Sequence, residues 1–450
     1  MARLRQTLGY LRESLWFVPA LLALASIGLA AVTVFIDAEA GAGNDALPFV
    51  YTGSIDGARE VLSTIAMSML TFTGLVFTIT MLVLQAASNQ LSPRVLRTFL
   101  RDRGNQLVLG LFVATFLFAL VVLRYTRSAG ENGDELVPGI SIGVAFGLLI
   151  ASIGAFIYYI DHMAQAIRAS TVIHNIAAET RQSIERLFPD PVGEPVPGSA
   201  PNDRPADGDG THREPPAEPP AALVRTDGSG VVTGVDEERL LRATRPAERS
   251  AGGGRFVEMV PQVGDYVVEG APLFRVWGAW QEHELEDLRG AVEMGSERTL
   301  ESDAAFGIRQ LVDIALRGLS PGINDPTTAV QAIDRIHDLL HRLSRRAIPA
   351  ALRRDPDGEA QLYLRRPGWA DYVVLAVEEI RLAGEGQVHV MRRLRQMLLD
   401  VLSVAPAGRQ PALRAAIERV DVSIRRGLHD EMDRQIASPS EPHGQGPMAS

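Results

Sequence analysis

Five polar side chains share one face of a long uncharged segment and are suited to contact water or ions. The five are Thr64, Ser68, Thr71, Thr78 and Gln85, at spacings of four, three, seven and seven residues. These spacings place them on one side of an α-helix. Lipid does not favour a hydroxyl row, whereas a neighbouring helix or a water-filled path does. The row therefore has two interpretations, packing between helices and the lining of a pore.

A basic segment follows this row directly. Ser92 and Pro93 predict a helix start, because a capping hydroxyl stands before proline at the first helical position. The arginines of this segment are Arg94, Arg97, Arg101 and Arg103. A short basic amphipathic helix suits the membrane surface, so we expect these arginines to contact lipid headgroups.

Four apolar segments are long enough to place these groups in a bilayer. They are Leu15–Ile36, Val61–Gln85, Leu107–Leu123 and Gly139–Ile160, each near the ~20 residues that a membrane-spanning helix needs. Arginine is concentrated before the first segment and after the second and fourth, while the stretch after the first is acidic. The positive-inside rule then predicts a multi-pass protein of the inner membrane with both termini in the cytoplasm.

Composition excludes several kinds of chemistry. The chain has no cysteine, and all 44 basic residues are arginine, so thiolate metal sites, P-loops and lysine-linked cofactors are excluded. The net charge of −10 argues against nucleic-acid binding. No charged residue lies in the middle of a span, which argues against a coupled transporter. No nucleophile with a neighbouring base is evident, so we expect neither an enzyme nor a cofactor.

The chain is expected to be an α-helical integral membrane protein with a cytoplasmic α+β part. The expected order is a transmembrane domain (1–162), a helical stalk that continues the fourth span (163–188), a disordered proline-rich linker (189–222), a small β module (223–278), a helical domain (279–436) and a disordered tail (437–450). The stretch VGDYVVEGAPLFRV resembles half of a lipoyl- or biotinyl-type barrel-sandwich module. Because the chain has no lysine, only a structural role remains for that module.

Two polar groups stand out in the expected helical domain. The motif SPGINDPTTA predicts a turn between two helices, with Ser320 and Pro321 ending one helix and Asp325 and Pro326 starting the next around Asn324. The motif is either a docking point for a partner or subunit, or an ordinary turn. Asp334, His337 and His341 share a helix face and are weak candidates for a metal site. A solvent-facing polar face is the alternative, and no metal is expected.

Four stretches together resemble a known bacterial family. They are LRESLWFVPALLAL, the block from Ser63 to Gln106, VGDYVVEGAPL and DAAFGIRQLVDIALRGLSPGINDPTTA. The family comprises predicted membrane proteins and is called domain of unknown function twenty-two fifty-four. The resemblance implies an integral membrane protein and no established activity. The proline-rich stretch after Phe188 departs from the family pattern.

Two functions are compatible with these features. The first is a homo-oligomeric ion channel lined by the second span and gated by tension or by a ligand on the cytoplasmic domain. The second is a non-conducting membrane-anchored scaffold or sensor, whose cytoplasmic domain binds an unidentified protein partner. Both place the chain in a lipid bilayer.

Overall fold

The structure is a computed structural model of the whole chain. It describes residues 16–40, 51, 54–90, 103–126, 138–166, 168–188, 216, 218–244, 255–349, 351–354 and 360–438. The chain divides into two compact units, Met1–Val172 and Ile173–Ser450, which are treated separately below.

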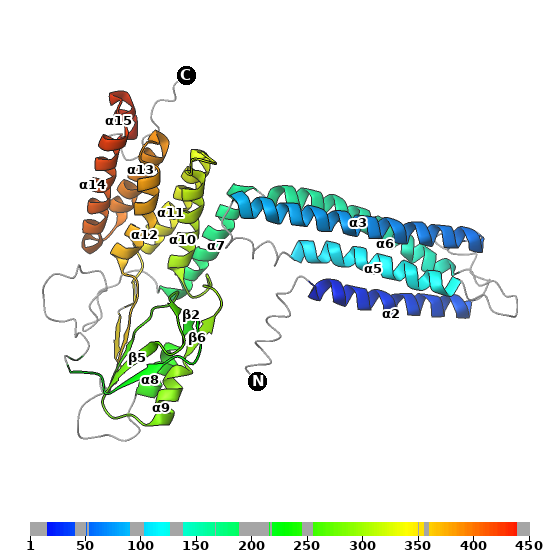
Figure 1. Ribbon diagram of the computed structural model, residues 1–450. Helices are drawn as coiled ribbons and strands as arrows, with labels where there is room; N and C mark the ends of the chain where they lie inside the picture. Colours follow the sequence, from blue (N-terminus) through cyan, green and yellow to red (C-terminus); the bar gives the residue numbers. More distant parts are fainter. Residues whose placement is uncertain are drawn as a thin grey trace. The chain divides into compact units, whose positions relative to one another are not determined.

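The described residues of the N-terminal unit form four long apolar helices (Figure 1). These are α2 (Phe17–Ala40), α3 (Ile55–Gln90), α5 (Arg103–Thr126) and α6 (Gly139–Ala166). Each contains a stretch long and apolar enough to cross a membrane. The four predicted spans are therefore confirmed. The second helix is longer than its predicted span, because α3 already begins at Ile55.

Helix α5 packs against all three other helices of this unit. In its most apolar stretch 56% of the residues are buried, compared with 17% in α3. Gly110 lets α5 approach α2 closely, since a Cβ atom there would lie 2.6 Å from Leu22 Cδ1 and 3.1 Å from the Cα atom of Pro19. The unit thus has α5 at its centre and leaves most of α3 exposed.

The expected stalk (163–188) is divided between two helices. Helix α6 ends at Ala166 and α7 runs over Ala169–Leu187. From Ile173 onward α7 belongs to the C-terminal unit. There it packs against α10 (Ala304–Gly318) at Gly307, where a Cβ atom would lie 1.9 Å from Thr180 Oγ1.

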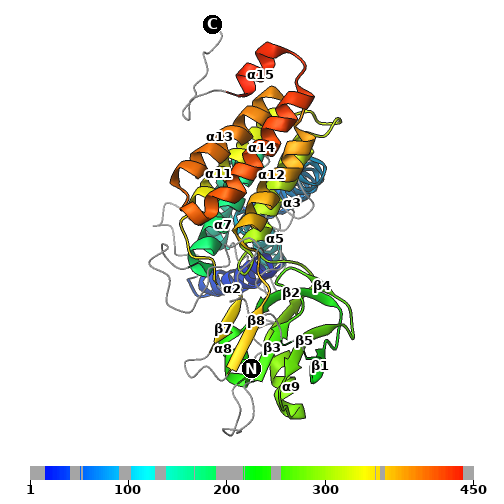
Figure 2. The ribbon, with the colours of Figure 1, turned by 90° about the vertical axis from the view of Figure 1, so that its left-hand side faces the viewer.

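Helices form one part of the C-terminal unit and lie side by side in Figures 1 and 2. Besides α7 and α10 they are α11 (Pro326–Leu343), α12 (Trp369–Ala383), α13 (Val388–Val404), α14 (Gln410–Gly427) and the short α15 (Glu431–Ala437), with a 3₁₀ turn at Ala407–Arg409. Ile333, Ile336 and Leu340 are fully buried, as their spacing predicts. Asp303 caps α10 by accepting from the Phe306 amide.

Two β-sheets form the other part of this unit. The strands are β1 (Ala222–Arg225), β2 (Gly230–Val235), β3 (Arg255–Met259), β4 (Tyr266–Val267), β5 (Pro272–Trp277), β6 (Val292–Gly295), β7 (Leu352–Arg354) and β8 (Ala360–Leu364). The larger sheet has the order β1-β5-β3-β8-β7 and the smaller one β4-β2-β6. Two short helices, α8 (Glu237–Thr244) and α9 (Glu282–Arg289), pack beside them.

The barrel-sandwich expectation for residues 223–278 is wrong, because both sheets are open. Three strands that complete them, β6, β7 and β8, come from the stretch 279–436 that was expected to be helical. Strand β8 pairs in parallel with β3, and its Leu362 is buried with Val257 and Phe274 in one core. Strands need partners, and here the partner of β3 follows about a hundred residues later, beyond the reach of local pattern.

Candidate functional site

The hydroxyl row of α3 lies opposite the face that packs inside the N-terminal unit. Leu62, Met69, Val76 and Val83 repeat every seven residues and are buried. Thr64, Thr71, Thr78 and Gln85 each follow one of these by two residues, about 200° around the helix, and all four are exposed. Ser68, at the edge of the row, is half-buried. Packing among the described residues of one chain therefore does not explain the row.

Two of the exposed threonines, Thr71 and Thr78, bond to their own helix. Thr71 Oγ1 donates to the carbonyl of Met67 at 3.0 Å, and Thr78 Oγ1 donates to that of Gly74 at 2.9 Å. Each hydroxyl proton thus has an acceptor one turn back, and each hydroxyl oxygen can still accept a bond from outside the helix. The row can face water or another subunit without breaking any bond that the chain makes.

A second hydroxyl row on α3 faces α6 instead. Thr80 Oγ1 lies 2.7 Å from the hydroxyl of Tyr159, so one of these two hydroxyls donates to the other. Both hydroxyl oxygens also lie within hydrogen-bonding distance of the Val76 carbonyl oxygen, at 2.8 and 3.0 Å, and the hydroxyl that accepts in the Thr80–Tyr159 bond can donate to it. Tyr159 is fully buried. Sequence reasoning did not single out Tyr159, because nothing in the pattern of α6 separates it from the exposed Tyr158.

Three aromatic rings pack together in the interior of the N-terminal unit. Phe72, Phe112 and Phe156, from α3, α5 and α6, have ring centroids 4.9 to 6.4 Å apart. The buried polar residues of α6, Ser141, Ser152 and Tyr159, follow one another at intervals of about 16 and 10 Å along the helix. These gaps are too long for a continuous hydrogen-bonded chain. The described buried polar groups of α6 thus form no continuous hydrogen-bonded chain along that helix.

One carboxylate, from another helix, caps the N-terminus of α6. Asp37 of α2 is buried and accepts bonds from the backbone amides of Ile140 and Ser141, both at 2.9 Å. It caps α6 from another helix, where the free amides and the helix dipole favour a negative group. The two positions are about a hundred residues apart, so no local signal links them.

The predicted basic elbow lies largely outside the described residues. Arg94, Arg97 and Arg101 fall in the stretch 91–102, together with Ser92 and Pro93. Arg103 is described, and it is the exposed first residue of α5. The lipid-headgroup role of the four arginines remains a prediction.

The SPGINDPTTA motif forms an ordered turn between α10 and α11. Asp325 caps α11 by accepting from the amide of Thr328 at 3.1 Å and from its hydroxyl at 2.6 Å, with Pro326 next. These bonds lower the pKa of Asp325, the Thr328 hydroxyl contributing most. The predicted helix start is therefore confirmed.

The tip of this turn is exposed. Asn324 has a φ of 48°, which the short amide side chain of asparagine tolerates. Pro321 and Ile323 are exposed beside it, and the half-buried Ser320 donates its hydroxyl to the carbonyl of Arg317. The turn thus has a fixed backbone and an accessible surface.

Two of the three weak metal candidates on α11, Asp334 and His337, contact an arginine. Asp334 pairs with Arg393 of α13, and His337 Nδ1 lies 2.8 Å from Arg393 Nη2. Burial lowers the pKa of His337, and the Arg393 charge lowers it further. His341 stands one turn on, with its ring centroid 6.5 Å from that of His337. Among the described residues no cluster of three His, Asp or Glu side chains could hold a metal ion.

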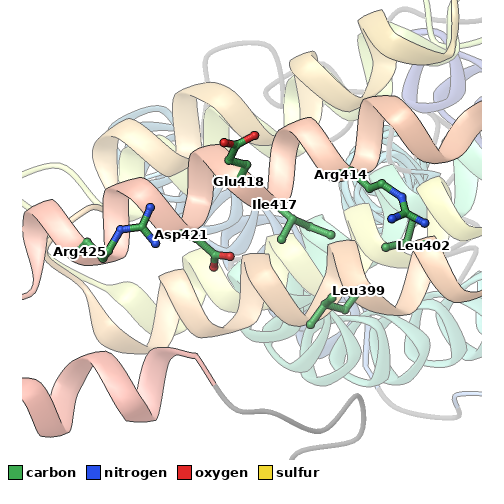
Figure 3. Close-up of a pocket in the computed structure, with 7 residues that line it drawn as sticks. All are labelled: Leu399, Leu402, Arg414, Ile417, Glu418, Asp421 and Arg425. Carbon is green, nitrogen blue, oxygen red and sulfur yellow. The ribbon is translucent and has the colours of Figure 1, made fainter.

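A shallow groove of about 310 Å³ lies between α13 and α14 (Figure 3). Leu399, Leu402 and Ile417 supply its apolar residues. Charged side chains of α14 also line it, namely Arg414, Glu418, Asp421 and Arg425. Asp421 is bonded to Arg395 at 2.7 Å. The groove contains no nucleophile paired with a base, and we assign it no chemistry.

Comparison with known proteins assigns the chain to a family. The family described as Predicted membrane protein (DUF2254) matches residues 12–400. The chain belongs to this family. An uncharacterized protein of Mycobacterium tuberculosis and one of Mycobacterium bovis are each 33% identical to it over 443 residues, covering 96% of this chain and 80% of each relative. No solved structure matches the chain.

The family consists of predicted membrane proteins, which agrees with the four apolar helices. The chain is therefore a multi-pass membrane protein. The match includes the hydroxyl row of α3 and the turn after α10, and it ends inside α13. Neither the family description nor the relatives' names give an activity. Function must therefore be inferred from the site itself.

Proposed function

We propose that the chain assembles into a homo-oligomeric channel in a bacterial inner membrane, with the exposed hydroxyl row of α3 facing a shared water-filled path. The observation that carries this proposal is the placement of Thr64, Thr71 and Thr78 opposite the packed face of α3. Hydroxyls that face neither the protein interior nor a partner in the same chain are better placed against water than against lipid.

The path is proposed to lie between subunits because the interior of one chain is filled. The rings of Phe72, Phe112 and Phe156 occupy the space where α3, α5 and α6 meet. On the outer face of α3, Gly74 stands between Thr71 and Thr78, and a Cβ atom at Gly74 would meet nothing within 4 Å. Small residues at such spacing allow another helix to approach closely. Copies of α3 are therefore expected to surround the path, with the gate responding to tension or to a ligand on the C-terminal unit.

Cysteine accessibility tests this proposal directly, because the chain has no cysteine of its own. Thr71→Cys and Thr78→Cys would be reacted in membranes with a charged, water-soluble thiosulfonate. Leu70→Cys is the matched control, since Leu70 is also exposed, at the same depth and about 100° around the helix from Thr71. We expect modification at positions 71 and 78 and none at position 70.

Conductance in planar bilayers gives the second readout. The purified protein should open discrete single channels, and modification at position 71 or 78 should change their conductance. Equal protection of all three cysteines would contradict a wetted row. Disulfide-linked dimers through position 71 or 78 in a protein that conducts nothing would instead identify the row as a packing surface between copies.

One observation supports a second candidate, a membrane-anchored scaffold or sensor. The turn after α10 is held by backbone bonds from Ile323 and Asn324 to the Ser320 carbonyl, at 3.0 and 2.8 Å, yet it exposes Ile323. An exposed side chain on an ordered loop is a common place for a binding contact. Ile323→Asp should abolish crosslinking of a protein partner while leaving conductance unchanged, and Val422→Asp, another exposed apolar position of this unit, is the control.

A further inference from the structure

Trp277 is the last residue of β5, an inner strand of the larger sheet. Trp277 pairs in register with Phe256 of β3, and the two rings meet edge to face with centroids 5.4 Å apart. The residue as a whole is only 8% exposed. Strand β1 lies on the other side of β5 (Figure 2), where Ala222 is the register partner of Val276. The indole is therefore presented at the point where the chain enters β1.

The indole N–H binds the end of the proline-rich stretch. Nε1 of Trp277 donates to the carbonyl of Glu218 at 2.8 Å. The backbone ladder with β5 ends nearby, where the Ala221 amide donates to the Val276 carbonyl at 2.8 Å. Pro219 and Pro220 have no N–H and cannot extend this ladder. The indole N–H of Trp277 thus supplies a hydrogen bond at the position where Pro219 and Pro220 have no backbone amide to bond β5.

This arrangement has the chemistry by which aromatic surfaces bind polyproline segments. A proline-rich segment offers carbonyl acceptors and no amide donors, and its extended conformation is largely formed before binding. An indole supplies both an apolar ring and a donor. The sequence repeats the unit Glu-Pro-Pro-Ala twice, at 214–217 and at 218–221, and the second copy is the one that meets Trp277.

We propose that the surface around Trp277 is a binding site for a proline-rich segment, occupied in this chain by its own second Glu-Pro-Pro-Ala unit. The site recognises the Glu218 carbonyl through the indole and the extended backbone that Pro219 and Pro220 impose. It fixes the end of the proline-rich stretch to the sheet. The inference does not depend on conduction, because every contact that supports it lies within the C-terminal unit.

Hydrogen–deuterium exchange on the full-length protein in detergent tests the site. Trp277→Phe keeps a ring against Phe256 and removes only the donor. We expect amide exchange at Ala221, whose N–H bonds the Val276 carbonyl beside this contact, to rise about five-fold, the factor expected for one lost hydrogen bond. Trp369→Phe is the matched control, since it removes an indole bond to the Arg409 carbonyl elsewhere in the same unit. Unchanged exchange in Trp277→Phe would overturn the proposal.

A second variant separates polyproline recognition from simple strand extension. Pro219→Ala combined with Pro220→Ala keeps the Glu218 carbonyl and restores two amide donors. If the site selects proline, exchange at Ala221 rises in this double variant, and a synthetic Glu-Pro-Pro-Ala-Glu-Pro-Pro-Ala peptide at millimolar concentration lowers exchange at Val276 and Trp277. The matching peptide with alanine for proline should have no effect. Slower exchange at Ala221 in the double variant, or equal action of the two peptides, would show an ordinary strand extension and overturn the proposal.

Discussion

The hydroxyl of Ser141, in the first turn of α6, donates a hydrogen bond of 2.6 Å to Oδ2 of Asp37 near the end of α2. Together with two backbone amides it makes Asp37 the cap of a helix that begins about a hundred residues later. The N-terminal unit therefore depends on a polar contact at one end of its helices as well as on apolar packing.

Asp37→Asn should destabilise the N-terminal unit by about 1 to 3 kcal/mol, because an amide replaces one of the two accepting oxygens of a buried cap. Thermal unfolding of the purified protein in detergent measures this change. Glu39→Gln, an exposed position two residues on, should have little effect. Equal unfolding temperatures for the two variants would show that the cap contributes nothing to stability.

Tyr159→Phe should cost about 1 kcal/mol, since it removes a buried hydroxyl that bonds both the Val76 carbonyl and Thr80. The neighbouring Tyr158→Phe is the natural control, because Tyr158 is exposed. A double-mutant cycle with Thr80→Val should give a coupling energy of at least about 0.5 kcal/mol. Additive effects would place the two hydroxyls out of contact.

Gly307→Ala should destabilise the C-terminal unit by about 1 to 3 kcal/mol, because the added methyl would overlap Thr180 where α7 crosses α10. Thr180→Gly in the same chain should recover part of that loss by removing the overlapping atoms. Chemical denaturation followed by tryptophan fluorescence reports both changes. Gly322→Ala, at an exposed glycine with open space around it, serves as the control.

Acid should weaken the contact between α11 and α13 through His337. Burial and the charge of Arg393 lower the pKa of His337 below its ordinary 6.5, against the opposite pull of Asp400 and Asp334 and alongside His341. The unfolded chain then binds the proton more readily than the folded one. The stability contributed by the neutral ring is therefore complete above pH 6.5 and is lost as the pH falls through the lowered pKa.

Denaturation at about pH 7.5 and about pH 5 measures this dependence. His337→Gln should reduce the loss of stability between the two values by about 1.4 kcal/mol for each unit by which the pKa is lowered. His429→Gln, at an exposed position, should leave the loss unchanged. An unaltered pH dependence in His337→Gln would assign the acid sensitivity to other groups.

Local features of the structure followed from local patterns of residues. The cap at Asp325 is confirmed, because a capping side chain acts on amides only two or three residues away. Strands β2 to β5 likewise lie inside the stretch 223–278 that was predicted to form the β module. The polar face of α11 was expected to meet solvent, but His337 and Asp334 meet Arg393 of α13, a contact that no pattern within α11 reveals.

The sequence by itself determined the four apolar helices and their family, since hydropathy and length are properties of each segment alone and a helix satisfies its backbone within itself. Only the tertiary structure decided which side of α3 is covered and which strands pair. Thr71 and Met69 differ by two residues, yet one is exposed and the other buried, because α5 and α6 pack on one side only. The open sheets required β8 to reach β3 from a distant part of the chain, a choice made by burial and not by local propensity.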